Sequence, residues 1–200
     1  MVTDDASLDI TTLASAGQTN NVFWQIYSCL DKHCYGRYAV YTAKKEALMY
    51  PRTAYFLDLD NLAGSGQPSA DDIHRVLDEF ERLCEPCQDD QVYCAGTAIS
   101  AYHCADYRPN YRVAVGRGKD GADRRLLELG DPEHVSRRFQ RVVIGSGDGI
   151  FAGVAQEYMT RGMRVELLVG KGALAGDLHR ALKRHIRDEV SSVRRLPSAA

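Results

Sequence analysis

The sequence predicts an α/β domain built on a central parallel sheet. Short apolar segments that end in glycine or polar residues alternate with segments whose apolar residues recur at helical spacing. Such alternation favours parallel strands joined by right-handed crossovers. The predicted strands span residues 54–60, 91–95, 111–115, 141–144 and 164–169.

Helices are predicted in the intervening segments. Ser69 and Asp72 are spaced like a capping pair, and the apolar residues that follow mark one face of a helix that runs to about Cys84. A second helix is expected from about Phe151, with Gly162 as its C-cap. The last predicted helix covers residues 174–186.

The composition fits one ordinary soluble domain with an appendage. The chain has 200 residues, of which 44% are hydrophobic and 26% are charged. We divide it into an N-terminal extension over 1–50, partly disordered and then helical, a main domain over 51–190, and a C-terminal tail over 191–200. The apolar residues of the extension are read as extra core, although they could instead mediate a homodimer.

The chain lacks the features of a membrane or secreted protein. No apolar run approaches the roughly 20 residues that a membrane span needs, and the acidic N-terminus does not resemble a signal peptide. We therefore expect a cytoplasmic protein with no membrane partner. Because the formal net charge is -2, any contact with nucleic acid has to come from a local basic patch.

The cysteines allow two interpretations. Cys84-Glu85-Pro86-Cys87 has the spacing of a zinc-binding pair, and His103 and Cys104 follow downstream. No second pair of this spacing exists, and this one comes at the predicted end of a helix rather than its start. Reduced, partly buried cysteines are the favoured interpretation.

Three aspartates follow predicted strands in a way that indicates a metal site. Asp58 closes the first strand, Asp123 begins the helix after the third, and Asp148 lies in a glycine-rich turn after the fourth. In a parallel sheet these positions share one edge, where ligands bind. Converging carboxylates repel one another unless a divalent cation neutralises them. Mg²⁺ prefers one or two carboxylates plus water and substrate phosphate, so the pattern predicts a metal-dependent nuclease.

Three phrases resemble one known family. FLDLDNL, GKDGADRRLLEL and RVVIGSGDGIFAGVAQEYMTRGMRVELLV are similar in order and spacing to the NYN domain, a branch of the PIN-like nucleases. The resemblance covers roughly residues 53–187. Asp58 and Asn61 match its first motif, Asp123 its second, and Ser146 and Asp148 its third.

The resemblance implies both a fold and an activity. The fold would be a PIN-like, Rossmann-like three-layer sandwich whose parallel sheet has about five strands in the order 3-2-1-4-5. The activity would be a Mg²⁺- or Mn²⁺-dependent endoribonuclease, with RNA as partner.

Roles follow for the individual residues. Asp58, Asp123 and Asp148 are expected to hold the ion, with Asp60 as a further ligand. Asn61 and Ser146 would act with them in catalysis by positioning water and the scissile phosphate. Basic residues beside Asp123 would contact phosphate, although residues of this kind at a helix start are often merely solvated: Arg117, Lys119 and Arg124.

Two alternatives stay open. Ile150 stands where the family usually carries another acid, which allows an inactive RNA-binding module. Asp58-Leu59-Asp60 after an apolar strand also resembles the opening of haloacid-dehalogenase-like phosphatases, in which Asp58 would be the nucleophile and Asp60 a general acid. Hydrolysis of small phosphate esters would indicate the phosphatase, and metal-dependent cleavage of RNA the nuclease.

Overall fold

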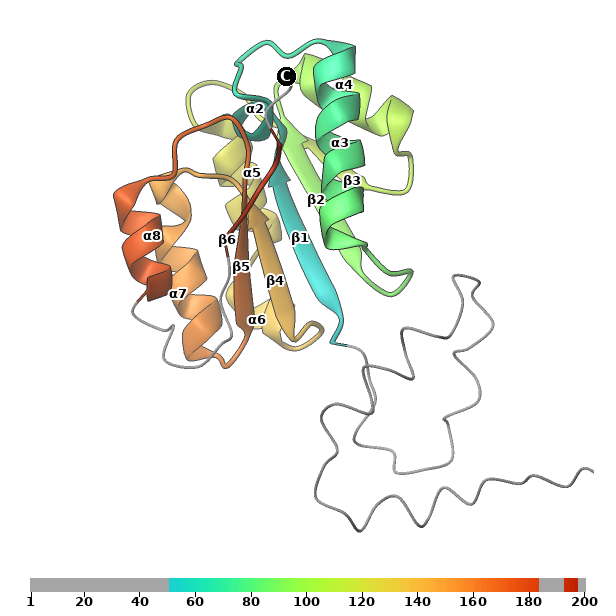
Figure 1. Ribbon diagram of the computed structural model, residues 1–200. Coiled ribbons are helices and arrows are strands. Elements are labelled where there is room, and N and C mark those ends of the chain that lie inside the picture. Colours follow the sequence, from blue (N-terminus) through green and yellow to red (C-terminus); the bar gives the residue numbers. More distant parts are fainter. Residues whose placement is uncertain (1–50, 184–192, 198–200) are drawn as a thin grey trace, which may run out of the picture. The chain divides into compact units, whose positions relative to one another are not determined.

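A parallel sheet forms the centre of the domain in the computed structural model, which describes residues 51–183 and 193–197 (Figure 1). The strand order is β3-β2-β1-β4-β5-β6. Because β1 lies between β2 and β4, the sheet changes its direction of growth there, and ligands of open α/β sheets bind at such a point. The strands are β1 (Thr53–Asp58), β2 (Gln91–Gly96), β3 (Arg112–Val115), β4 (Arg141–Gly145), β5 (Arg164–Val169) and β6 (Val193–Arg195).

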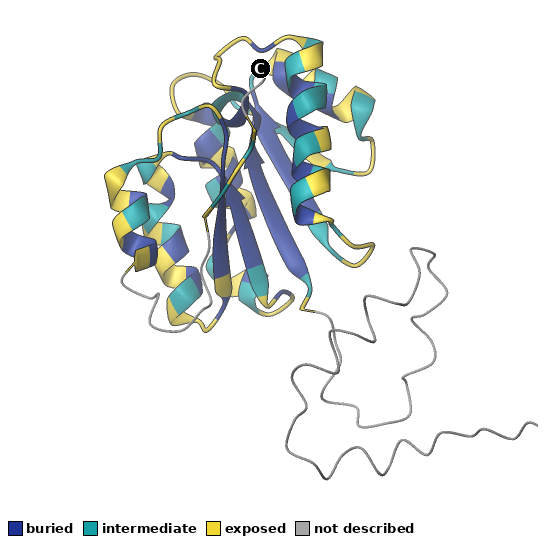
Figure 2. Ribbon diagram, in the orientation of Figure 1, coloured by how far each residue is buried: buried dark blue, intermediate teal, exposed yellow. Residues whose placement is uncertain are grey.

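Helices cover both faces of the sheet, which gives the expected three-layer α/β arrangement. One face carries α2 (Leu59–Ala63), α3 (Ala70–Cys84) and α4 (Ala98–Tyr107). The other carries α5 (Gly121–Leu129), α6 (Pro132–Ser136), the 3₁₀ turn η3 (Gly149–Phe151), α7 (Ala152–Thr160) and α8 (Gly176–Lys183). The strands are buried between these layers, and the outer faces of the helices are exposed (Figure 2).

Strand β1 is buried on both faces, as its continuous apolar run predicts. Tyr55 packs edge-on against Phe80 of α3 at a ring-centroid distance of 5.1 Å. Phe56 points to the opposite face and stacks on Tyr93 at 5.0 Å. Each aromatic pair contributes about 0.5–1.5 kcal/mol beyond its buried area. These contacts fix the strand whose last residue is Asp58.

The predicted start of α3 is confirmed in detail. The Ser69 side chain accepts a hydrogen bond from the Asp72 N–H, and the Asp72 side chain accepts one from the Ser69 N–H. This reciprocal capping box satisfies two backbone donors that the first turn leaves unpaired.

The number of strands and the C-terminal tail need correction. The sequence predicts about five strands followed by a tail over 191–200, whereas the described residues form six strands, because Val193–Arg195 pairs with β5 in parallel. The Arg194 side chain holds this strand in place. Its guanidinium lies 3.5 Å from the buried Glu166 carboxylate and also donates a hydrogen bond to the Leu83 carbonyl. A three-residue strand with two arginines gives no apolar signal in the sequence.

The first predicted strand is also too long. We expected it to run through Asp60, whereas β1 ends at Asp58 and the chain turns directly into α2. The sequence does not predict α2, α4 and α6. The N-terminal extension over 1–50 and its proposed homodimer contact lie outside the described residues.

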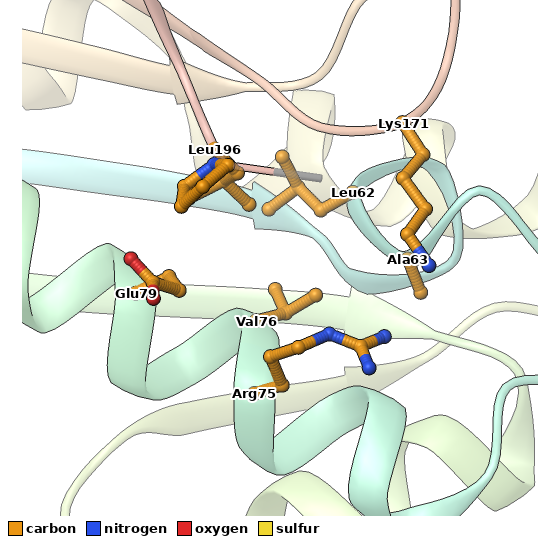
Figure 3. A pocket seen from close by; sticks show the side chains of 8 residues that line it. Leu62, Ala63, Arg75, Val76, Glu79, Lys171 and Leu196 are labelled. Carbon is orange, nitrogen blue, oxygen red and sulfur yellow. The ribbon is translucent and has the colours of Figure 1, made fainter. Parts of the chain in front are cut away.

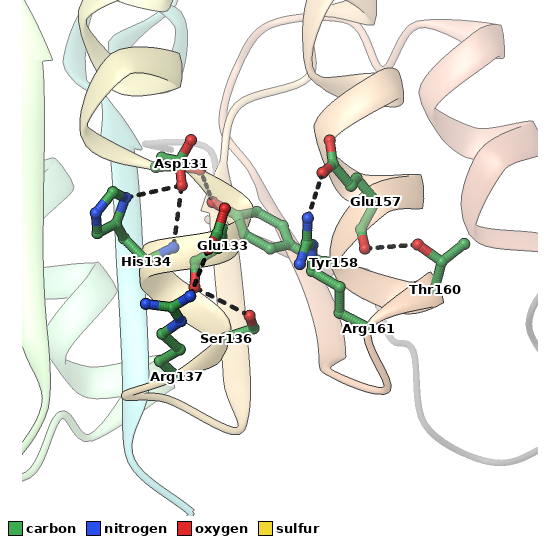
Figure 4. A network of polar contacts seen from close by, with 10 residues as sticks. Asp131, Glu133, His134, Ser136, Arg137, Glu157, Tyr158, Thr160 and Arg161 are labelled. Carbon is green, nitrogen blue, oxygen red and sulfur yellow. Dashed lines mark hydrogen bonds and ion pairs between the residues drawn. The ribbon is translucent and has the colours of Figure 1, made fainter.

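The junction of α5, α6 and α7 fixes the end of the helix that carries Asp123 (Figure 4). The Tyr158 hydroxyl of α7 donates to the carbonyl of Gly130, the C-cap of α5. Asp131 then caps α6 by accepting from the His134 N–H at 3.0 Å. The ion pairs drawn beside this junction, such as Glu157 with Arg161, are exposed and contribute little.

Within the described ranges, no helix combines the length and the apolar character that crossing a bilayer requires.

Candidate metal centre

Asp58 lies where β1 meets α2 and is almost fully buried, with 5% of its surface exposed. As the N-cap of α2, its Oδ1 accepts a hydrogen bond from the Asn61 N–H at 3.2 Å. Side chains alternate along β1, so Asp58 points to the same face as Phe56, the face that α5 covers. Its carboxylate therefore faces the helix that carries the second predicted acid.

Asp123 is buried in the first turn of α5, with 8% of its surface exposed. The turn before it is very tight: a Cβ on Gly116 would lie 2.2 Å from the Ala122 nitrogen. Glycine at this position lets α5 start directly beside the end of β3, which brings Asp123 over the sheet edge. The Asp123 Oδ1 is buried and has no hydrogen-bond partner among the described residues. A buried carboxylate oxygen without a donor is costly unless something else binds it.

The turn after β4 joins Asp58 to the third acid. The Ser146 hydroxyl donates to Asp58 Oδ2 at 3.3 Å and accepts from the Asp148 N–H at 3.1 Å. The Gly147 N–H donates to Asn61 Oδ1 at 3.0 Å. These bonds cross the point between β1 and β4 where the sheet changes its direction of growth. The structure therefore brings Asn61 and Ser146 together with Asp58, and places the exposed Asp148 beside them.

The electrostatics of this site are those of uncompensated acids. Burial, and then repulsion from Asp123, raise the pKa of Asp58 to about 7. The pKa of Asp123 is also raised, first by burial and further by the charges of Asp148 and Asp120, while a hydrogen bond with the Asp58 carboxyl opposes this rise. None of Asp58, Asp123 and Asp148 forms an ion pair with a basic side chain in the described part of the chain. A divalent cation would supply the missing positive charge.

Asp60 is directed elsewhere. Because the chain becomes helical after Asp58, the Asp60 carboxylate reaches α4, where Oδ2 accepts from the Thr97 N–H at 2.8 Å and Oδ1 accepts from the buried Ser100 hydroxyl. Its charge still raises the pKa of Asp58, but more weakly than burial and Asp123 do. The structure thus gives Asp60 a role in holding the start of α4 and does not bring it to the Asp58–Asp123 pair as a ligand.

The predicted basic residues border the site without entering it. Arg117 and Lys119 are exposed in the loop between β3 and α5, and Arg124 is exposed on α5 next to Asp123. The Arg124 guanidinium donates to the Lys119 carbonyl, which braces this loop. All three side chains remain open to solvent near the acids.

The cysteine motif does not form a zinc site in the part of the chain that the structure describes. Cys84 is buried and Cys87 is exposed, and neither is in a disulfide. Across these ranges, no three His, Cys, Asp or Glu side chains are gathered closely enough to hold one ion, and this includes Asp58, Asp123 and Asp148. The acids at the sheet edge offer two buried carboxylates and a third, exposed carboxylate nearby. That donor set fits Mg²⁺ or Mn²⁺, which retain several waters, better than zinc.

Sequence reasoning missed the loop after β5. Its Ala175 N–H donates to the Gly147 carbonyl at 2.8 Å, and a Cβ on Gly147 would lie 2.5 Å from the Ala173 carbonyl oxygen. The loop therefore packs directly on the turn that carries Ser146 and Asp148. The signal was present as Gly170-Lys171-Gly172, which follows a strand at the same edge of the sheet.

Comparisons with known proteins add little to this site. No protein-family model matches the chain, and no curated protein matches it. Among solved structures, a pyrazinamidase of Pyrococcus horikoshii in complex with zinc aligns with a TM-score of 0.39 and 16% sequence identity, over 72% of this chain and 99% of that one. A similarity at this level bears on neither the activity nor the metal of this protein.

Proposed function

We propose that this protein is a metal-dependent endoribonuclease. The observation that carries the proposal is the pair of buried carboxylates, Asp58 and Asp123, which lack a basic partner among the described residues and lie where open α/β sheets bind ligands. Burying two like charges together is unfavourable, and a bound cation would remove that cost.

Asp58 and Asp123 would hold Mg²⁺ or Mn²⁺, and Asp148 would contribute through water. When bound, such an ion would polarise a phosphate oxygen and lower the pKa of a water molecule. Asp58 is kept in orientation by the Ser146 hydroxyl and the Asn61 N–H. Asn61 in turn holds the Gly147 backbone, so these residues fix both sides of the site at once.

RNA is proposed as the substrate because exposed basic side chains adjoin the acids on one side. Arg117, Lys119 and Arg124 would contact backbone phosphates, which positions a strand without reading its sequence. A cytoplasmic location and a homodimer through the N-terminal extension stay predictions.

One observation supports a second candidate. Ile150 is 40% exposed beside Asp148, and its N–H donates to Asp148 Oδ1 at 3.0 Å. An apolar residue at this position supplies no further ligand, which favours an RNA-binding module with weak or no cleavage. The phosphatase alternative is less well supported, because the Asp60 carboxylate is occupied by Thr97 and Ser100 and is not free to act as a general acid.

Cleavage of single-stranded RNA by the full-length protein, with Mn²⁺ or with a chelator, tests the proposal. We expect cleavage only with metal, and a loss of at least about 100-fold in rate for Asp58→Asn and for Asp123→Asn. The matched control is Asp106→Asn, an exposed aspartate on α4, which should cleave like the wild type.

The same preparations separate the alternatives. Hydrolysis of p-nitrophenyl phosphate without cleavage of RNA would favour the phosphatase, and RNA binding without metal-dependent cleavage would favour the binding module. Unchanged cleavage by Asp58→Asn would overturn the site assignment.

A further inference from the structure

The backbone of the loop after β5 packs against α2 and fixes the position of Lys171. A Cβ on Gly170 would lie 2.1 Å from the Leu62 carbonyl oxygen, and a Cβ on Gly172 would lie 3.0 Å from Asn61 Oδ1. The Lys171 N–H donates to the Leu62 carbonyl at 3.3 Å. Two glycines thus allow the backbone on either side of Lys171 to lie directly against the short helix that Asp58 caps.

The Lys171 side chain borders a small, shallow hollow between α2, α3 and the C-terminal segment (Figure 3). The floor of this hollow is apolar and consists of Leu62, Ala63, Val76 and Leu196. Lys171 and Arg75 lie at one end, on either side of Ala63, whereas Glu79 lies at the other end. The hollow therefore has a positively charged end and an uncharged floor.

The charge at this end is not fully neutralised. Arg75 pairs with Asp72, but its guanidinium has further N–H donors. Lys171 is exposed and forms no ion pair with a residue in the described ranges. Lys171 and the remaining N–H groups of Arg75 are therefore available to an anion placed between them.

We propose that Lys171 and Arg75 form a second phosphate-binding subsite for single-stranded RNA, one that receives the strand as it leaves the acidic site. This inference rests on the proposed function. Asp58 is the N-cap of α2 and Ala63 is the last residue of that helix, so the two positions are roughly 7 Å apart along its axis. A nucleotide next to the scissile phosphate can span such a distance.

The subsite lies on the other side of the acids from the basic residues already considered. Arg124 is on α5, which covers one face of the sheet, whereas Arg75 is on α3, which covers the opposite face. A strand bound at both places would cross the edge of the sheet with the acids beneath its middle. The sugar and base of the outgoing nucleotide would lie over the half-buried Leu196.

The test is binding of a short, fluorescently labelled single-stranded RNA to the full-length protein in buffer that contains a chelator. Fluorescence anisotropy measures the binding at several salt concentrations. We expect Lys171→Ala to raise Kd roughly three- to tenfold and to make the slope of log Kd against log salt shallower by about 0.7, because one phosphate contact is lost. Lys171→Arg should restore both values.

Lys183→Ala is the matched control. Lys183 is exposed at the end of α8, a helix that packs on the opposite face of the sheet from the hollow. It should change neither Kd nor the slope. Circular dichroism of each variant establishes that it is folded.

The outcomes distinguish this inference from the proposed function. An unchanged Kd and slope for Lys171→Ala, or no binding of RNA by the wild type, would overturn the inference, even if RNA is cleaved under the control of Asp58. A weaker and less salt-dependent complex for Lys171→Ala would support the subsite, even if the wild type binds RNA without cleaving it.

Discussion

Among the described residues, buried carboxylates lie in two regions, and the charge is balanced in one region but not in the other. Glu166, in the first half of β5, is 1% exposed. Its carboxylate oxygens lie 2.8 Å from Arg141 Nη2, 3.0 Å from Arg164 Nε and 3.5 Å from Arg194 Nη2. Asp58, at the end of β1, is 5% exposed and has another acid, Asp123, as its charged neighbour. Both side chains are enclosed by the same domain, but only the first is neutralised by the described part of the chain.

The difference separates a buried charge that is neutralised from one that is left unbalanced. The arginines around Glu166 join β4, β5 and β6, so that carboxylate links strands. At Asp58 the neighbouring polar groups are hydrogen-bond donors, Ser146 and the Asn61 N–H, which orient the carboxylate without balancing its charge. Charge left unbalanced in a buried site is expected where a ligand supplies the balance. This contrast is the physical basis of the proposed metal centre.

The largest expected effect is on stability at the neutralised region. Glu166→Ala leaves Arg141, whose side chain is 18% exposed, without its carboxylate partner. Removing one member of a buried ion pair should lower the free energy of unfolding by about 3 kcal/mol. Denaturation by urea measures this, with the exposed Glu157→Ala as control, for which the loss should stay below about 1 kcal/mol. Equal losses for the two variants would remove the distinction drawn above.

The second effect has the opposite sign and depends on pH. The pKa of Asp58 is about 7 in the folded protein and lower in the unfolded chain, so the folded state binds more protons between these values. The contribution of Asp58 to the stability of the metal-free protein should therefore fall as pH rises from about 4 to about 7. Asp58→Asn removes the charge and should raise the free energy of unfolding at pH 8 by roughly 2 kcal/mol.

Urea denaturation in a chelator across this pH range checks that expectation. As pH rises, the stability of the wild type should decline relative to that of Asp58→Asn. Addition of Mn²⁺ at pH 8 should stabilise the wild type and leave Asp58→Asn little changed, since a ligand stabilises only the state that binds it. The same pH dependence of stability in the wild type and in Asp58→Asn would contradict the assignment of the raised pKa.

The smallest expected effect comes from completing the acidic site. Ile150 is half-exposed next to Asp148, so Ile150→Asp should be accommodated without disturbing the core. The added carboxylate should raise the affinity for Mn²⁺ roughly tenfold, because ligand charge strengthens binding of hard cations. Ile150→Asn is the control of similar size, with a smaller gain. Titration calorimetry gives both affinities, and no gain for the aspartate would place residue 150 outside the site.

Much of the fold could be predicted because its strands are apolar and its helices periodic. The run from Tyr55 to Leu57 and the Ser69–Asp72 capping box are local signals, and both elements form as expected. Strand β6 could not be predicted, because its position depends on Arg194 reaching Glu166 and Leu83, residues far away in the sequence.

The candidate site was predictable in part for the same reason. Asp58, Asp123 and Asp148 follow secondary-structure elements whose ends share one edge of the sheet, so their order in the chain indicates their convergence. The direction of the Asp60 side chain depends on where β1 ends. Because the chain becomes helical at Leu59, the Asp60 carboxylate points to Ser100. Lys171 carries no signal of its own until Gly170 and Gly172 are seen to lie on α2.

Binding of Mn²⁺ to the full-length protein, measured by electron paramagnetic resonance at pH 8, tests the central claim most directly. Binding to the wild type that is lost in Asp58→Asn and in Asp123→Asn, but retained in folded Glu166→Gln, is the predicted result. Binding by Asp58→Asn that equals binding by the wild type would contradict the claim that a cation balances the Asp58–Asp123 pair.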